Sequence, residues 1–540
     1  MEPDAFRWSD ASWHGVSIEG QVIYELHIGT FTPEGTFDAA ASRLQYLHDL
    51  GVTLVEIMPV AECAGRWNWG YDGVQMFAPS HNYGDHEGFK RFVDRAHARG
   101  IAVILDVVYN HLGPDGNYLE KYSAHYFNQQ ARTEWGEPLN FDGDHNAGTR
   151  EFVIGNVCYW LREFHLDGFR LDATQSIFDS SDVHILAELT QSARAAALPR
   201  HIIVIAENEP QCSEHLLPVE AGGYGIDAMW NDDFHHSARV ALTGSRDGYF
   251  HDYSGRAQEF LSCIRRGFLY QGQWYSWQRQ ARGSPLHGRG APACIVFLQN
   301  HDQVGNTFTG VRIHTNCAPA RYRAMLALTL LAPQTPMLFM GQEFAASTPF
   351  NFFADHNEQL SSLVHAGRRE FMRQFRAYAD PAAQALIPDP RLERTFLASK
   401  LDWSECERHR ESLQLHRDLL QLRKHDPVIS LQDVDAIDGA TLGENVLALR
   451  WFNADHGDRL LLVNLDREHA PQGIAEPLLA PPRGSGWQTL WNSESPQYGG
   501  HGALPTVADH GRGAWHLQAQ SAALLIAAPR IVITEVAHDS

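Results

Sequence analysis

The segment FKRFVDRAHARGIAVILDVV, residues 89–108, decides the fold of this chain. Its first half carries apolar residues at helical spacing, and Gly100 ends that pattern. Its second half, residues 102–108, is a continuous apolar run of the kind found in strands that are buried on both faces. A helix followed at once by such a strand predicts an α/β fold with a parallel sheet.

The same alternation of strand and helix extends from this segment in both directions. Eight apolar runs are predicted to be strands: residues 22–28, 53–60, 102–108, 168–173, 202–207, 227–230, 295–300 and 335–340. Amphipathic stretches separate most of them, so the sequence predicts a (β/α)8 TIM barrel within residues 21–430. A polar and aromatic excursion at residues 111–148 interrupts the pattern after the third strand, and such long loops are usually functional.

The two ends of the chain differ from the barrel. Beyond Pro427, five short apolar runs follow with no helical pattern between them: residues 446–452, 459–465, 487–491, 515–519 and 522–527. They predict a C-terminal antiparallel β-sandwich domain over residues 431–540. Residues 1–20 are expected to be an N-terminal linker.

Composition and charge exclude several classes of function. The chain has 540 residues, of which 43 are Lys or Arg and 65 are Asp or Glu, giving a net charge of −22. This charge repels phosphate groups, so we expect neither a nucleic acid nor a membrane surface as partner. The N-terminus lacks a signal-peptide pattern, which predicts a cytoplasmic protein. The seven cysteines include no CxxC pair, which disfavours a disulfide framework or a zinc site.

Three acidic residues follow predicted barrel strands, at the end of the barrel where active sites lie. Asp172 and Glu207 lie at the ends of the fourth and fifth predicted strands, and Asp302 follows the seventh. A single carboxylate in such a position is often only a helix cap or a solvated loop residue. However, FRLDA sets Arg170 and Asp172 in an apolar frame on one face of a strand, and buried charges are costly unless they are paired or functional. We therefore expect these residues to converge on one site.

Two carboxyl groups across a pocket are typical of glycoside hydrolysis. Arg170 would keep Asp172 ionised, which favours Asp172 as the nucleophile. Glu207 follows an apolar run, which favours a raised pKa and the role of general acid. Asp302 would either stabilise an oxocarbenium-like state or bind sugar hydroxyls. The reaction needs neither a metal nor an organic cofactor.

Four segments resemble, in order, the motif regions of the α-amylase superfamily, glycoside hydrolase family 13: DVVYNH (106–111), GFRLDA (168–173), IAEN (205–208) and FLQNHD (297–302). The resemblance implies a retaining mechanism on α-glucosidic bonds, with Asp172 as nucleophile, Glu207 as acid/base and Asp302 as transition-state stabiliser. The implied substrate contacts around the cleaved sugar are Tyr71, Asp106, His111, Arg170 and His301. Tyr71 would stack under that sugar, although a packed loop tyrosine is the alternative. The superfamily often binds calcium near Asn110, but a hydrogen bond from Asn110 to the barrel rim is an equal explanation.

Five further segments are similar to superfamily members that act on α-glucans ending in trehalose: residues 24–37, 231–236, 242–250, 300–306 and 347–356. They imply cleavage of the α-1,4 bond next to the terminal trehalose of maltooligosyltrehalose, with a maltooligosyltrehalose synthase as functional partner. The implied contacts on the trehalose side are Asp232, Asp233, His236, Gln303 and Asn306.

Other activities within the superfamily remain open at this point. A branching enzyme, a transglycosidase or an α-amylase would carry the same acidic residues. A non-catalytic member is disfavoured, because all three carboxylates are present. Superfamily members of this kind carry a β-sandwich module before the barrel, and residues 5–15 resemble the linker that follows it.

Overall fold

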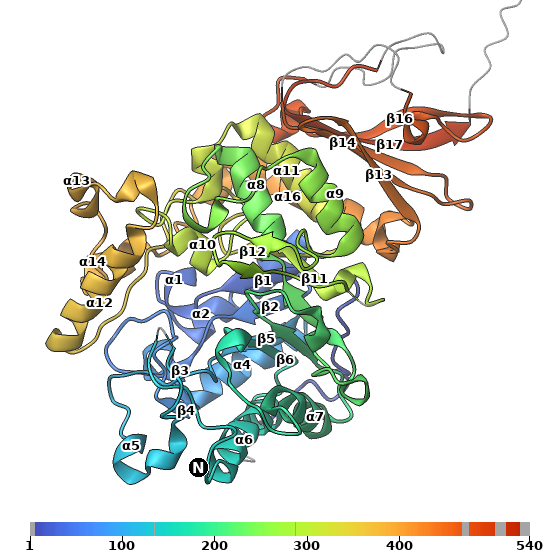
Figure 1. Cartoon of the computed structure of the whole chain (residues 1–540). Helices are drawn as coiled ribbons and strands as arrows, with labels where there is room; N and C mark the ends of the chain where they lie inside the picture. The colour runs from blue at the N-terminus through green and yellow to red at the C-terminus, as the bar shows by residue number, and fades with distance from the viewer. Residues whose placement is uncertain (1–5, 134, 287, 467–474, 503–514, 530–540) are drawn as a thin grey trace, which may run out of the picture.

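The computed structural model describes residues 6–133, 135–286, 288–466, 475–502 and 515–529. Its barrel strands are β1 (Ile23–Leu26), β2 (Leu54–Ile57), β5 (Ala102–Val107), β6 (Gly168–Leu171), β7 (Ile203–Ala206), β8 (Ala228–Trp230), β11 (Cys294–Phe297) and β12 (Thr335–Phe339). They pair in parallel and close in the order β1-β12-β11-β8-β7-β6-β5-β2. The predicted TIM barrel is confirmed, and each of the eight predicted runs overlaps one of its strands (Figure 1).

The inside of the barrel has an apolar layer below a charged layer. Side chains such as Leu54, Ile104 and Ile205 pack together in the lower layer. Residues two positions further along a strand point to the same face, so Glu56 and Asp106 lie in the layer above. The residue pattern of the strands thus gathers charge at the carboxyl ends, where the loops that form the site begin.

Helices cover the outside of the barrel. They include α3 (Leu44–Leu50), α4 (His86–His97), α6 (Ala147–Glu163), α7 (Ile185–Ala197), α8 (Asp232–Thr243), α11 (Pro319–Leu331) and α16 (Arg410–His425). The helix predicted from residue 89 is α4, and the carboxylate of Asp85 caps it by accepting from the Gly88 N–H at 2.7 Å. No helix in the described part of the chain is long and apolar enough to cross a membrane.

Two stretches, one between barrel strands and one after the last of them, contain helices that the sequence analysis did not predict. The stretch after α8 forms α9 (Ala257–Arg266) and a short hairpin of β9 (Trp274–Tyr275) and β10 (Gln280–Ala281). After β12 the chain forms α12 (Glu358–Met372), α13 (Pro381–Gln384) and α14 (Glu393–Ala398). Figure 1 shows these three helices together on the side of the barrel away from the C-terminal strands.

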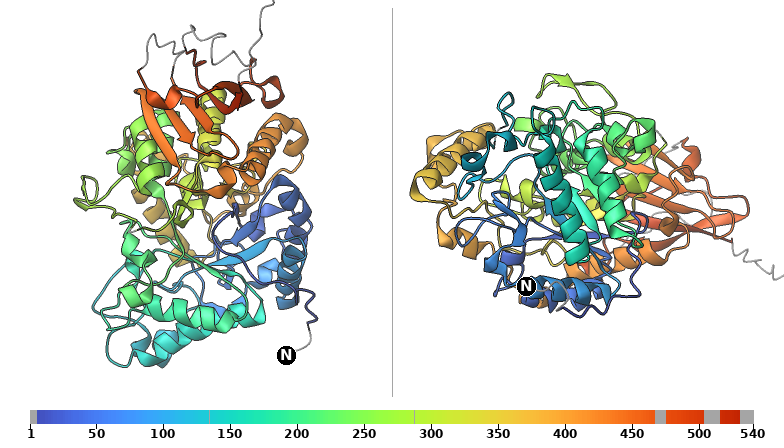
Figure 2. Two further views of the ribbon diagram at one scale, coloured as in Figure 1. Left: turned by 90° about the vertical axis from the view of Figure 1, so that its right-hand side faces the viewer. Right: turned by 90° about the horizontal axis from the view of Figure 1, so that it is seen from below.

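The C-terminal domain is antiparallel, as predicted. Its strands are β13 (Ile437–Gly443), β14 (Val446–Trp451), β15 (Arg459–Asn464), β16 (Ser485–Asn492) and β17 (Ser521–Pro529), in the order β13-β14-β15-β17-β16. The described residues form one sheet, and helices α9 and α11 take the place of a second sheet against one of its faces (Figure 2). Residues 515–519 form no named strand, whereas β13 was not predicted. Because both faces are covered, β14 is apolar along nearly its whole length.

The described residues before β1 are docked under the barrel. Trp13 stacks on His97 with ring centroids 4.7 Å apart, and its indole N–H donates to Asp167 at 2.7 Å. The Oδ2 atom of Asp10 lies 2.9 Å from Nδ1 of His97. The expected linker is therefore held against the end of the barrel opposite the carboxyl ends of the strands.

Candidate active site

Arg170 is the centre of the site. Strand β6 carries it inside the barrel, where it is fully buried. Its Nη1 donates to both oxygens of Asp106 at 2.9 Å and to Oδ1 of Asp172 at 2.7 Å. Its Nη2 donates to Oε2 of Glu207 at 2.7 Å. One guanidinium therefore holds three carboxyl groups that come from three neighbouring strands.

Strand register explains this convergence. Asp106 on β5 pairs directly with Arg170 on β6, and Glu207 follows the end of β7. At the start of β6 the backbone of Gly168 has φ +139°, and a Cβ there would lie 1.7 Å from the carbonyl oxygen of Ile203. Glycine is thus required for β6 to approach β7 closely enough for one arginine to span the carboxylates.

Asp172 is held through both of its oxygens. Oδ1 accepts from Arg170, and Oδ2 accepts from the Asn110 side chain at 2.8 Å. The other side of the Asn110 amide contacts Nδ1 of His111. Asn110 is therefore fully engaged by the protein, which matches the hydrogen-bonding explanation given above for this residue. The Asp172 side chain keeps an exposed fraction of 12% at the mouth.

Glu207 is a partly exposed acid in a carboxylate-rich setting. Its Oε2 accepts from Arg170 and from the backbone N–H of Ala173 at 3.0 Å. Burial raises the pKa of Glu207 well above its ordinary value, and the charges of Asp172, Asp302 and Asp232 add to this effect against the opposing charge of Arg170. This carboxyl group therefore tends to keep a proton, as a general acid requires.

Tyr71 and His301 line the same mouth. The Tyr71 hydroxyl donates to Oδ2 of Asp106 at 2.6 Å and lies 2.8 Å from Nε2 of His301. The two rings are stacked, with centroids 5.1 Å apart. Nε2 of His301 also lies 3.6 Å from Oδ2 of Asp302, whose side chain is 39% exposed. The structure thus brings together Asp106, Arg170, Asp172, Glu207, His301 and Asp302 around a single mouth, as the sequence suggested.

The predicted residues of the trehalose side are arranged unequally. Asp232 is part-exposed, and burial raises its pKa to about 7, helped by Glu209, Asp233 and Asp302 against Arg282. Asp233 is fully buried, and its carboxylate accepts from Tyr253, Arg282 and two backbone N–H groups at 2.7–3.0 Å. Its oxygens are thus engaged by the chain that follows α8. Asp232 is the neighbour whose charge acts on Glu207.

The remaining predicted residues lie around the loop after β11. His236 is nearly buried among the rings of Tyr249, Phe250 and Tyr253. Gln303 accepts from Tyr249 at 3.4 Å. Asn306 accepts from Nη1 of Arg368 at 2.5 Å. His111, on the other side of the mouth, stacks on the exposed Trp135 with ring centroids 5.7 Å apart.

Several residues of this region were missed by the sequence analysis. Glu25 on β1 contacts His301. The ring centroid of Trp230 on β8 lies 4.2 Å from Cζ of Arg170. Arg368, which binds Asn306, comes from the unpredicted α12. Glu25 had a usable signal, because it is a lone acid inside an apolar strand. Arg368 had none, since nothing near it in sequence marks the site.

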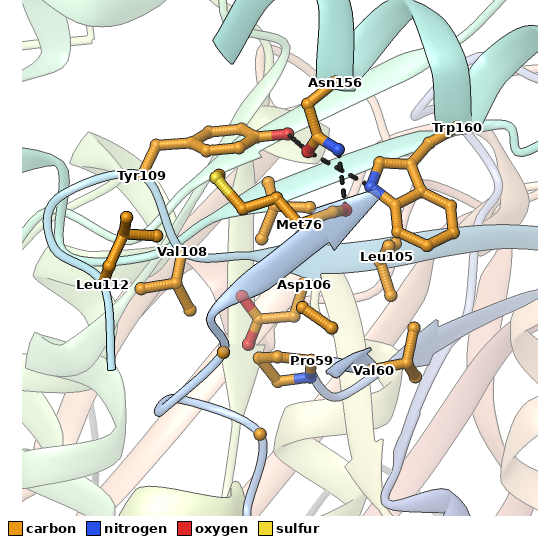
Figure 3. A pocket seen from close by; sticks show the side chains of 14 residues that line it. Pro59, Val60, Met76, Leu105, Asp106, Val108, Tyr109, Leu112, Asn156 and Trp160 are labelled. Carbon is orange, nitrogen blue, oxygen red and sulfur yellow. Dashed lines mark hydrogen bonds between the residues drawn. The ribbon is translucent and has the colours of Figure 1, made fainter. Parts of the chain in front are cut away.

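A cavity lies next to Asp106, on the outer side of β5 (Figure 3). Asn156 spans its wall, accepting from the hydroxyl of Tyr109 at 2.9 Å and from the indole N–H of Trp160 at 3.2 Å while donating to the carbonyl of Met76 at 2.7 Å. These bonds fasten α6 to the end of β5.

Across the described residues, no group of three or more His, Cys, Asp and Glu side chains is placed to hold a metal ion.

The family models agree with both domains. Residues 2–138 match the model described as alpha amylase, catalytic domain, and residues 435–524 match a domain of unknown function, DUF3459. A parallel barrel whose mouth carries an arginine-bound set of carboxylates, together with this match, defines a glycoside hydrolase of the α-amylase superfamily.

Relatives that match over most of their length identify the family within this superfamily. The chain is 42% identical to the malto-oligosyltrehalose trehalohydrolase of Deinococcus radiodurans, over 86% of this chain and 75% of the relative. It is 43% identical to the enzyme of the same name from Rhizobium sp. strain M-11, over 80% and 72%. The chain belongs to the malto-oligosyltrehalose trehalohydrolase family. A crystal structure from Salmonella typhimurium, provisionally named an alpha amylase, has a TM-score of 0.83 and 35% identity, covering 97% of this chain and 85% of that one.

Proposed function

We propose that this chain hydrolyses the α-1,4-glucosidic bond next to the terminal trehalose of maltooligosyltrehalose and releases trehalose. The observation that carries the proposal is the binding of Asp172 and Glu207 to one buried guanidinium, which sets two carboxyl groups side by side at the barrel mouth. The names of the relatives support the choice of substrate. Such a substrate has to be made by a synthase that forms the terminal trehalose unit.

The reaction follows from the two carboxyl environments. Asp172 attacks the anomeric carbon of the glucose before the trehalose unit, forming a covalent glycosyl-enzyme. Glu207 donates its proton to the departing oxygen of trehalose and then takes a proton from the water that hydrolyses the intermediate. Arg170 and Ala173 bind Oε2 of Glu207, which leaves Oε1 to carry the proton. Asp302 stabilises the positive charge that develops on the sugar ring.

The trehalose unit is expected to lie against the loops after β8 and β11. Asp232, Gln303 and Asn306 offer hydrogen-bonding groups there, and His236 adds its ring edge. Asp233 acts differently, since its carboxylate holds Arg282 and the chain after α9 in place. Tyr71 and His111 are assigned to the cleaved sugar on the opposite side.

Product analysis tests the proposal. The protein is incubated separately with maltotriosyltrehalose and with a plain maltooligosaccharide of equal length, and the products are identified by NMR. We expect free trehalose from the first, much slower cleavage of the second, and no products from the Asp172→Asn variant. Fast cleavage of the plain chain with the trehalose-ended chain left intact would instead indicate an amylase, and new α-1,6 linkages would indicate a branching enzyme.

A further inference from the structure

A chain of hydrogen bonds runs below the sugar site from β1 to Arg170. Oε1 of Glu25 lies 2.5 Å from Nδ1 of His301, and Oε2 of Glu25 accepts from the His301 backbone N–H at 3.0 Å. Nε2 of His301 lies 2.8 Å from the Tyr71 hydroxyl, which reaches Asp106 at 2.6 Å. Glu25 and His301 are almost completely inaccessible to solvent.

Counting protons along this chain decides the state of His301. Asp106 accepts from Arg170 through both oxygens, so it behaves as a carboxylate and the single Tyr71 proton must point towards it. The Tyr71 oxygen is then the acceptor for His301, and Nε2 must carry a proton. On the other side of the ring, Nδ1 faces a carboxyl oxygen at 2.5 Å, and that contact needs a second proton.

The second proton is carried either by Nδ1 of His301 or by Oε1 of Glu25. The charges that face His301 decide between them. Asp302 lies 3.6 Å away on α10 (His301–Gly305) and Glu25 lies on β1, whereas the charge of Arg170 opposes their effect. Burial lowers the pKa of His301, but the charges of Asp302 and Glu25 outweigh burial and raise it to about 9. Two carboxylates thus favour a cationic ring.

Glu56 is a second buried acid beside Glu25. It is the parallel-register partner of Glu25 on β2, it is fully buried, and both of its carboxyl oxygens lack a hydrogen-bond partner among the described residues. Burial, together with the charges of Glu25 and Asp106, raises the pKa of Glu56 well above its ordinary value. Of these two adjacent acids, Glu56 is the one without donors and therefore the one that takes a proton, whereas Glu25 faces two nitrogens of His301.

We propose that Glu25 is a positioning residue that holds His301 as a doubly protonated imidazolium, so that Nε2 donates its proton to the Tyr71 oxygen and orients the Tyr71 hydroxyl towards Asp106. This assignment rests on the proposed function for its catalytic consequence, but the protonation state of His301 is a property of the free protein. The partner of one ring nitrogen fixes what the other nitrogen presents. Glu25 therefore acts on the substrate only through His301.

Nitrogen-15 NMR of the histidine rings tests the assignment without any substrate. The His301→Gln variant identifies the signal of His301 in protein labelled at histidine. In the parent protein at pH 8 we expect both ring nitrogens of His301 to be protonated, and in Glu25→Gln we expect a neutral ring at the same pH. A neutral His301 in the parent protein would overturn the proposal, and this measurement does not depend on the folding of any Glu25 variant.

Kinetics supply the second readout. Glu25→Gln should lower kcat roughly 10-fold or more with a smaller change in KM, as is typical when a partner that orients a site residue is lost. Glu56→Gln is the matched control, because it replaces a neutral buried acid by a neutral amide on the adjacent strand. It should leave kcat within about twofold of the parent value. Both ring nitrogens of His301 should remain protonated in this variant at pH 8. Equal losses in both variants, or a Glu25→Gln enzyme with parental kcat, would contradict the assignment. Failure of the proposed substrate would appear instead as absence of trehalose from every variant and from the parent.

Discussion

Nη1 of Arg170 lies 2.7 Å from Oδ1 of Asp172, two residues further along the chain, and the same guanidinium reaches Glu207 through Nη2. Residues two apart on a strand share a face, so this contact is built into the local sequence. The arginine fixes the orientation of one carboxyl group and brings the other beside it. The predictions below test what this arrangement does.

Replacing Asp172 by Asn should abolish turnover while leaving the fold intact. The amide occupies the same volume, but it lacks the charge needed to attack the anomeric carbon. Loss of a nucleophile of this kind lowers kcat by about 10⁴-fold or more. Trehalose release measures the activity, and circular dichroism with a thermal melt checks the fold. A variant that keeps a tenth of the parental rate would refute the assignment of Asp172.

Replacing Glu207 by Gln should remove both the general acid and the alkaline limb of the pH profile. In the parent, Glu207 must be protonated to act, so kcat/KM falls as pH rises through its raised pKa. The variant should lose about 10²- to 10⁴-fold on the natural substrate. An aryl α-glucoside whose leaving group needs no proton should recover much of the first step. Equal losses on both substrates would argue against the acid role.

Replacing Arg170 by Met should destabilise the protein as well as inactivate it. Asp106, Asp172 and Glu207 then lose their shared cation, and breaking a buried ion pair costs about 3–5 kcal/mol. The charge of Arg170 opposes the burial that raises the pKa values of Asp106 and Glu207, so without it both folded-state pKa values rise further above the unfolded ones. The stability deficit of the variant should therefore be smaller at low pH and grow as pH rises, as measured by urea unfolding at pH 5 and pH 8.

Arg323→Met is the control for that experiment. Arg323 on α11 also forms a buried pair, with Glu494 at 2.6 Å, but it contacts the C-terminal domain. We expect a similar loss of unfolding free energy with the catalytic rate of the folded fraction preserved. If Arg323→Met inactivates the enzyme as completely as Arg170→Met, loss of activity is a consequence of instability alone.

Asp232→Asn and Asp233→Asn should behave as opposites despite being neighbours. Asp232 is assigned to the trehalose unit and has a pKa raised to about 7 by burial, so its amide variant should raise KM several-fold and flatten the pH dependence of KM between pH 6 and 8. Asp233→Asn breaks a buried pair with Arg282, so it should lower the free energy of unfolding by about 3–5 kcal/mol. Similar KM effects with equal stability would show that the two residues have not been distinguished correctly.

The pair of contacts made by His97 should make stability depend on pH. Burial lowers the pKa of His97, but hydrogen bonds to Asp10 at 2.9 Å and to Asp167 at 2.8 Å outweigh it and raise the pKa above 6.5. A raised folded-state pKa gives stability that is fully present below pH 6.5 and is lost as pH rises through the folded value. The stability difference between parent and His97→Gln should therefore shrink from pH 6 to pH 9. His48→Gln, at an exposed histidine, is the control variant for the effect of losing a histidine side chain.

The sequence by itself determined the barrel and the identity of the acids. A continuous apolar strand has apolar side chains on both faces, so both faces of its sheet have to be covered, as they are in a parallel sheet flanked by helices. The charged residues at the ends of such strands then meet at one mouth of the barrel. Arg170, Asp172 and Glu207 were therefore found from local pattern. The C-terminal strands followed from the same reasoning, although it did not foresee that helices α9 and α11 would cover the sheet in place of a second one.

Only the tertiary structure decided which side chains stay accessible at the barrel mouth and which are held by the protein. Successive residues of a helix point about 100° apart, so the sequence could not tell that Asp233 turns into the fold while Asp232 does not. Nor could it pair Glu25 with His301, or bring Arg368 from α12 to Asn306, since those contacts join residues that are distant in the chain. Local pattern fixes which residues are buried, whereas the partners of buried charges are fixed by how the strands and loops are packed around them.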